Sequence, residues 1–231
     1  MPKAPAQSVQ GLEHGIRCLL HLASAEAPVG CRELARALGF EPTKVSRLLG
    51  TLAHLGLAAQ TPDKKYVAGS GLNVLAALSL RGSRLLRAAL PRVDALAAGL
   101  GRGVALGVLW ETRVCYLYHG AAGQGGTLAT IGGHELYPAE KSAIGLALLA
   151  QAPAGEAAAL FPGLPQLPKE LTAARKRGYA VGATGSVGVC IGGEARLGGL
   201  AVDSCAAADA PGVAAALRDC AEGIFAAWAA A

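Results

Sequence analysis

Residues 31–66 read CRELARALGFEPTKVSRLLGTLAHLGLAAQTPDKKY, and this stretch decides the fold of the N-terminal part. A short helix ends at Gly39, which lacks a side chain and so allows the positive φ of a sharp turn. A second helix begins at Pro42, and a Pro-Asp-Lys-Lys turn between two short strands follows it. This order predicts a winged helix-turn-helix, which reads the DNA major groove. The second helix repeats its apolar residues with helical spacing, at Val45, Leu48, Leu49, Leu52 and Leu55.

The opposite face of that second helix carries small, polar or basic side chains, which suits entry into a groove. Residues 1–100 hold 12 Lys and Arg against 6 Asp and Glu, whereas residues 101–231 hold 9 against 10. The positive charge therefore lies beside the predicted DNA-binding elements, where counterion release would use it. Arginine is the best reader of guanine, and lysines at the turn supply phosphate contacts. We expect DNA contact from Pro42, Thr43, Lys44, Ser46, Arg47, Thr51, Lys64 and Lys65.

The chain resembles the IclR-type bacterial transcription regulators in blocks that follow the family order over nearly its whole length. The blocks are Ser8–Ile16, Glu33–Gly39, Val45–Leu52, Tyr66–Gly69, Ala143–Ala150, Arg177–Ala180 and Gly188–Ile191. The resemblance implies a ligand-responsive regulator that binds a palindromic operator in double-stranded DNA as a homodimer or homotetramer. It also implies a GAF-like C-terminal domain, with an antiparallel sheet and a pocket for a small-molecule effector such as an organic acid.

We predict an α+β chain with a winged helix-turn-helix domain over residues 8–69 and a linker helix over 70–82. A GAF-like effector-binding and oligomerisation domain covers 83–231. The first helix, 8–24, is expected to bury Val9, Leu12, Ile16, Leu19, Leu20 and Ala23. Another helix starts at Ser83, and Pro91 kinks or divides it. In the last domain we expect strands at 104–110, 114–118, 127–131, 187–191 and 197–202, and helices at 142–150, 172–177 and 212–230.

The resemblance places the effector against a strand pair and the start of the helix at 142–150. Ser142 matches a hydroxyl position there, and its backbone N–H is expected to hold a carboxylate. The implied effector-binding residues are Gly132, Gly133, Glu140, Ser142, Cys190 and Asp203. Glu140 stands where the family often has a histidine, and Asp203 stands where the family often has a small polar residue on the last strand. Both would repel an anionic effector unless Lys141, Arg113 or Arg196 offset them. The alternative is that Ser142 only caps the helix and Cys190 only packs in the core.

The sequence contains no complete catalytic motif, so we expect that the protein is not an enzyme. Glu140-Lys-Ser142 ends like a phosphate-binding loop, but positions 135 and 140 are glutamates where glycines are required. The six cysteines show no C-x-x-C spacing, which argues against a zinc site, and no cofactor is expected. The chain has no apolar run of about 18 residues and no apolar leader, so we expect a cytoplasmic protein without membrane contact. Two other functions stay open: a ligand-independent DNA-binding regulator with a degenerate pocket, and a sensor whose winged domain mediates protein contacts.

Overall fold

The computed structural model describes residues 7–121, 125–127 and 136–230. The chain divides into two compact units, Met1–Ser83 and Arg84–Ala231. The predicted effector residues Gly132 and Gly133 lie outside the described residues, as does most of the strand expected at 127–131. No helix in the described part of the chain is both long and apolar enough to cross a membrane.

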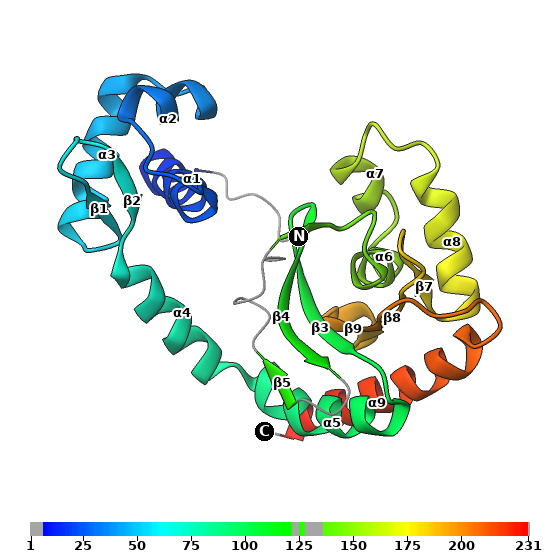
Figure 1. Cartoon of the computed structure of the whole chain (residues 1–231). Coiled ribbons are helices and arrows are strands. Elements are labelled where there is room, and N and C mark those ends of the chain that lie inside the picture. The colour runs from blue at the N-terminus through cyan, green and yellow to red at the C-terminus, as the bar shows by residue number, and fades with distance from the viewer. Residues whose placement is uncertain (1–6, 122–124, 128–135, 231) are drawn as a thin grey trace. The chain divides into compact units, whose positions relative to one another are not determined.

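The first unit is a helix-turn-helix followed by a two-stranded hairpin (Figure 1). Gly39 caps the second helix with φ 68°, and Gly56 follows the third with φ 72°, so both glycines occupy the left-handed region that their turns require. Pro42 is the first residue of the third helix, as the sequence predicts. The elements are α1 Gln10–Ser24, α2 Cys31–Leu38, α3 Pro42–His54, β1 Ala58–Gln60, β2 Tyr66–Ala68 and α4 Ser70–Gly82.

The prediction of which face of α1 is buried is wrong. Instead, the small residues Gly15 and Cys18 are buried together with Leu22, because they let α1 approach the core made with α2 and α3. Of the six residues expected inside, only Leu19 packs against this core. The large apolar side chains of the other stripe are exposed: Val9 by 70%, Leu12 by 63%, Ile16 by 45% and Leu20 by 37%.

The helix α4 also leaves its apolar residues in solvent, and none of its residues is buried. Val74, Leu75 and Leu78 are each more than half exposed. Leu55, expected on the buried face of α3, is 61% exposed because the helix ends at His54 and Leu55 already belongs to the turn. The first unit therefore carries two exposed apolar surfaces, one on α1 and one on α4.

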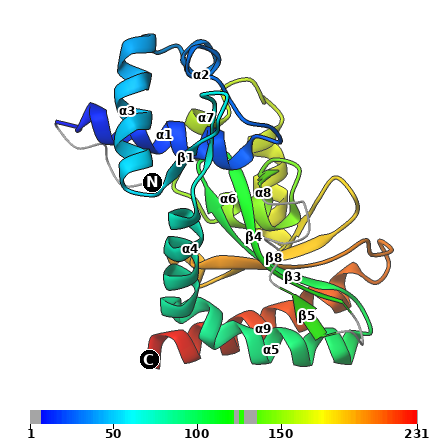
Figure 2. The same ribbon diagram turned by 60° about the vertical axis from the view of Figure 1, so that its left-hand side comes forward.

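The second unit is built on an antiparallel sheet with the strand order β5-β4-β3-β9-β8-β7, and β6 pairs with the outer part of β4. Helices α6, α7 and α8 pack on one face, and α5 and α9 on the other (Figure 2). The strands are β3 Val104–Trp110, β4 Arg113–Ala121, β5 Gly125–Thr127, β6 Tyr137–Pro138, β7 Ala180–Val181, β8 Val187–Ile191 and β9 Gly198–Val202. The helices are α5 Arg84–Leu100, α6 Ala143–Ala150, α7 Glu156–Leu160, α8 Leu167–Arg177 and α9 Ala210–Ala230.

The short helix α6 lies unusually close to the sheet, and all eight of its residues are buried. Glycines in the strands beneath it make this approach possible. A methyl group on Gly199 would lie 2.8 Å from Ile144 Cγ2, and one on Gly188 would lie 2.7 Å from the backbone of Ala143. The start of α6 is thereby fixed over the middle of the sheet. On the other face, α5 runs through Pro91 without division.

Candidate functional site

The predicted groove-facing residues of α3 lie on one open face. Pro42, Thr43, Ser46, Arg47 and Thr51 are exposed, and Lys44 is half-buried. The Thr51 hydroxyl donates a 3.0 Å hydrogen bond to the carbonyl oxygen of Arg47, which ties that side chain to its own helix. The opposite stripe, Val45, Leu49 and Leu52, is buried in the core. The face is thus held by a rigid helix and carries one exposed guanidinium.

The wing, residues 61–65 between β1 and β2, is held by hydrogen bonds around Thr61. Its Oγ1 accepts from the N–H of Lys65 at 3.1 Å and donates to Asp63, and its carbonyl accepts from the N–H of Lys64 at 2.9 Å. The Thr61 bond lowers the pKa of Asp63, and Lys65 lowers it further. Lys64 and Lys65 are exposed, and Lys64 has φ 63°. A non-glycine residue in this region is strained, which is common where a side chain has a functional role.

In the second unit, polar side chains gather on the α6 face of the sheet. Ser142 precedes α6 and is only 2% exposed. Its Oγ accepts from the N–H of Gly145 at 3.3 Å and lies 3.1 Å from the hydroxyl of Tyr116 on β4. The N–H of Ser142 donates to the carbonyl oxygens of Pro138 at 3.2 Å and Ala139 at 3.3 Å. These groups are engaged within the chain, and the carboxylate-binding role that the resemblance implies for Ser142 stays a prediction.

A second polar pair lies on the same face of the sheet. His119 Nε2 lies 3.1 Å from Asp203 Oδ2, and the two side chains are 44% and 61% exposed. Asp203 follows β9 and lies against Gly103, where a methyl group would come within 2.5 Å of Oδ2. Any side chain at position 103 would therefore collide with the Asp203 carboxylate, and glycine avoids this clash. We call Tyr116, Ser142, His119 and Asp203 the polar cluster.

The pKa of the Tyr116 hydroxyl is shifted by its neighbours in this cluster. Burial raises the pKa of Tyr116 most, while the hydrogen bond with Ser142 lowers it. Tyr137 and Asp203 raise the pKa of Tyr116 further, because negative charge nearby disfavours a phenolate.

Tyr116 and His119 escaped the sequence-based prediction because a β-bulge in β4 changes the direction of its side chains. Gly107 pairs with Tyr116, Leu106 with Tyr118 and Ala105 with His119, so Leu117 is the extra residue. Directly opposite residues share a face, which places Tyr116 and His119 on the α6 side. Tyr118 turns to the other side, where its hydroxyl donates to Asp94 of α5. Simple alternation would have put Tyr116 and Tyr118 together.

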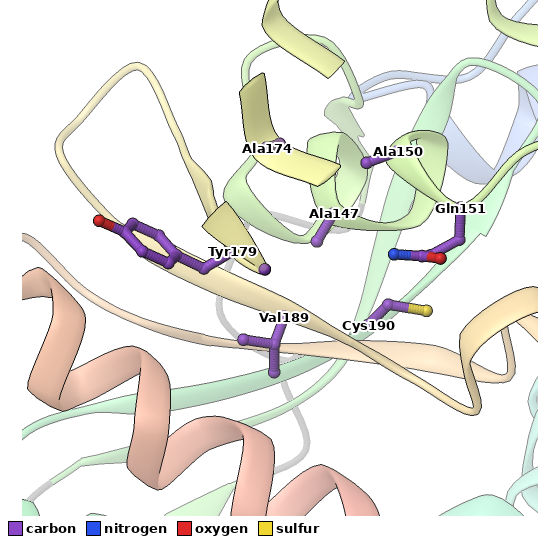
Figure 3. Close-up of a pocket in the computed structure, with 8 residues that line it drawn as sticks. Ala147, Ala150, Gln151, Ala174, Tyr179, Val189 and Cys190 are labelled. Atoms are coloured by element: carbon purple, nitrogen blue, oxygen red, sulfur yellow. The ribbon is translucent and has the colours of Figure 1, made fainter. Parts of the chain in front are cut away.

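Cys190 lies apart from the polar cluster. It is on the same face of the sheet as Tyr116, but Gly199 and Gly107 lie between the two residues on the intervening strands. The side chain of Ile144 covers both glycines. Cys190 lines a separate pocket with about 190 Å³ of empty space, together with residues of α6, α8 and β8. Gln151 and Cys190 lie at one end and Tyr179 at the other (Figure 3). Part of this space is open solvent, and the cavity volume is only about 20 Å³, far below the roughly 300–1,000 Å³ of most small-molecule sites.

The other predicted effector residue in the described part of the chain is Glu140, which is half-buried in the turn before α6. No group of three His, Cys, Asp or Glu side chains that could hold a metal ion occurs within the described ranges. Burial raises the pKa of the Cys190 thiol to about 11, so this sulfur is protonated and unreactive at neutral pH.

Comparison with known proteins relates the N-terminal helices and strands to a protein family. Residues 11–62 match the family model of the IclR helix-turn-helix domain. This segment makes up most of the N-terminal unit and is similar to an IclR-type helix-turn-helix domain. The match ends inside the IclR wing, just before Asp63, and includes every predicted contact residue of α3. No curated protein sequence matches the chain.

The whole chain has the fold of solved IclR regulators. An IclR family transcriptional regulator from Brucella abortus superposes with a TM-score of 0.82 at 20% identity, over 97% of this chain and 96% of that one. A regulator from Alicyclobacillus acidocaldarius gives 0.73 at 20% identity, over 96% and 99%. An IclR homologue from Microbacterium hydrocarbonoxydans, crystallised with 4-hydroxybenzoate, gives 0.68 at 22% identity, over 96% and 100%. At these identities the likeness concerns the fold.

Proposed function

We propose that this chain is an IclR-type transcription regulator that binds a palindromic operator through α3 and the wing. The observation that carries the proposal is the exposed polar face of α3, with Arg47 at its centre, within the IclR-type domain. Arg47 would read guanine bidentately, and Thr43, Ser46 and Lys44 would flank it in the groove. Lys64 and Lys65 would contact phosphate and add affinity that depends on salt. We propose that the protein binds DNA in the cytoplasm and that it has no catalytic activity.

A homodimer would supply the two-fold symmetry that a palindrome needs. The exposed apolar stripe of α1 and the exposed residues of α4 both belong to the DNA-binding unit, and a second copy would bury them. A patch of this kind left in solvent is uncommon on a monomer. The double substitution of Leu12 and Ile16 by Glu is expected to give a folded monomer with weakened operator binding, measured by light scattering and gel shift. A dimer that survives these changes would rule out the α1 surface.

Selection of bound DNA from a random pool at physiological salt tests the DNA-binding proposal. We expect a palindrome for the native protein and a relaxed preference at one base position per half-site for Arg47→Ala. Discrimination there should fall by about 1–3 kcal/mol. Arg218→Ala on α9 is the charge-matched control, because Arg218 is exposed and lies in the other unit. If Arg47→Ala recovers the same motif as the control, Arg47 is not the reader.

We also propose that the polar cluster forms part of an effector site. It is supported by the position of the cluster at the start of α6 and by the solved protein of the same fold that carries 4-hydroxybenzoate. Glu140, Cys190, Gly132 and Gly133 remain predicted members of the site. One observation favours the ligand-independent alternative: Tyr116 and Ser142 satisfy one another. A rise in melting temperature with a small ligand would exclude that alternative, since such a ligand stabilises only the folded state that binds it.

A further inference from the structure

The polar cluster has the charge pattern of a site for a cation. Asp203 is the carboxylate of the cluster, and its side chain is 61% exposed, so it is accessible to a ligand. His119 contacts this carboxylate through Oδ2 at 3.1 Å. A protonated amine gains a charge-assisted hydrogen bond from such a carboxylate, whereas an organic acid is repelled by it.

The groups that would hold an anion are occupied. Ser142 donates its N–H to Pro138 and Ala139, and its hydroxyl is shared between Gly145 and Tyr116. The next N–H of α6, that of Ala143, is covered by Gly182, since a methyl group there would lie 2.8 Å from this nitrogen. The start of the helix therefore offers little to a carboxylate.

Two of the three cations that the sequence suggested as compensation lie away from the cluster, whereas the third, the exposed Lys141, directly precedes Ser142. Arg196 makes a bidentate pair with Glu156, at 2.7 and 3.2 Å. Arg113 begins β4 opposite Trp110, at the other end of the strand from His119. Arg102 bonds the carbonyl oxygen of Ser204 at 3.2 Å and the carboxylate of Asp209 at 3.4 Å. Asp203 raises the pKa of Tyr116, since negative charge near this hydroxyl disfavours a phenolate.

We propose that the effector site takes a ligand with a protonated amine, bound by Asp203, and discriminates against organic acids. The inference rests on the proposed effector function of the cluster. His119 would bind a neutral polar group of the ligand, because it lies on the same face as Asp203. The sequence difference at Asp203 would thus set the ligand class of this regulator.

Three probes of one size test the proposal on the full-length protein: 4-hydroxybenzylamine, 4-hydroxybenzyl alcohol and 4-hydroxybenzoate. Titration calorimetry and thermal shift would give their dissociation constants. We expect the amine to bind at least about tenfold more tightly than the acid, a difference of about 1.4 kcal/mol. Asp203→Asn should remove most of this preference. Asp219→Asn, which changes an exposed carboxylate on α9, should keep it, and circular dichroism checks that both variants fold.

Equal or tighter binding of the acid overturns the proposal, and so does an amine preference that survives Asp203→Asn. Absence of binding by all three probes also overturns it. The DNA selection described above is run on the same preparation. A recovered palindrome without probe binding refutes the ligand class alone, whereas failure to recover any motif refutes the DNA-binding function whatever the probes do.

Discussion

The ammonium nitrogen of Lys65 lies 3.7 Å from the carboxylate of Asp63, at the tip of the wing. An exposed pair of this kind contributes little to stability, but it lowers the positive charge that Lys65 presents to DNA. Lys64, next to it, is exposed and held in the left-handed region. The two lysines of the wing are therefore not equivalent, although the sequence presents them as a pair.

The wing predicts different salt dependences for its lysines. Lys64→Ala should reduce the slope of log K against log salt by about one, because one phosphate contact is lost. Lys65→Ala should reduce it less, and Asp63→Asn should raise the affinity for all sequences alike. Fluorescence anisotropy over a salt series measures all three. A larger effect for Lys65→Ala than for Lys64→Ala would contradict the role given to Asp63.

The φ of 63° at Lys64 predicts that glycine stabilises this position relative to alanine. Lys64→Gly and Lys64→Ala lose the same charge and should weaken DNA binding equally. Lys64→Gly should nevertheless unfold with a free energy about 1 kcal/mol higher than Lys64→Ala, since only the glycine relieves the left-handed strain. Urea unfolding of the two variants gives this difference directly. Equal stabilities would mean that the turn relaxes when the lysine is removed.

The close fit of α6 predicts that Gly145 tolerates no side chain. A methyl group there would lie 2.2 Å from the carbonyl oxygen of Ala139, in a segment that is fully buried. Gly145→Ala should lower the free energy of unfolding by about 3 kcal/mol, the upper range for overpacking. Gly212→Ala, with nothing within 4 Å, is the matched control on α9 and should raise it by roughly 0.5 kcal/mol. A neutral Gly145→Ala would show that α6 moves away from the sheet at little cost.

Cys190 predicts a loss of stability at alkaline pH. Its pKa rises from 9.0 to about 11, mainly through burial, so the folded state keeps the proton more strongly than the unfolded chain. The stabilisation is therefore complete below pH 9 and disappears as the pH rises from 9 to 11. Between pH 9 and 11, the free energy of unfolding of Cys190→Ala should fall by about 1 to 2 kcal/mol less than that of the native protein. Denaturant unfolding at pH 8.5 and 10.5 measures it, and parallel losses in both proteins would disprove it.

The sequence predicted the elements of the first unit because their signals are local. Gly39, Pro42 and Gly56 fix the ends of the helices through their own backbone preferences, and each stands where the prediction put it. The face of α1 could not be predicted in the same way. Two apolar stripes compete on that helix, and the smaller side chains are buried because they allow α1 to approach α2 and α3.

By itself, the sequence determined the helix-turn-helix with its exposed basic face, the longer strands and helices of the second unit, and the resemblance to IclR regulators, but it missed β6, β7 and α7. Only the tertiary structure brought Tyr116, Ser142, His119 and Asp203 together. The reason is physical: a bulge at Leu117 reverses the alternation of β4, and long-range pairing of β3 with β4 and β9 brings His119 beside Asp203. Helix signals lie within a few neighbouring residues, whereas the register of a sheet depends on partners far along the chain.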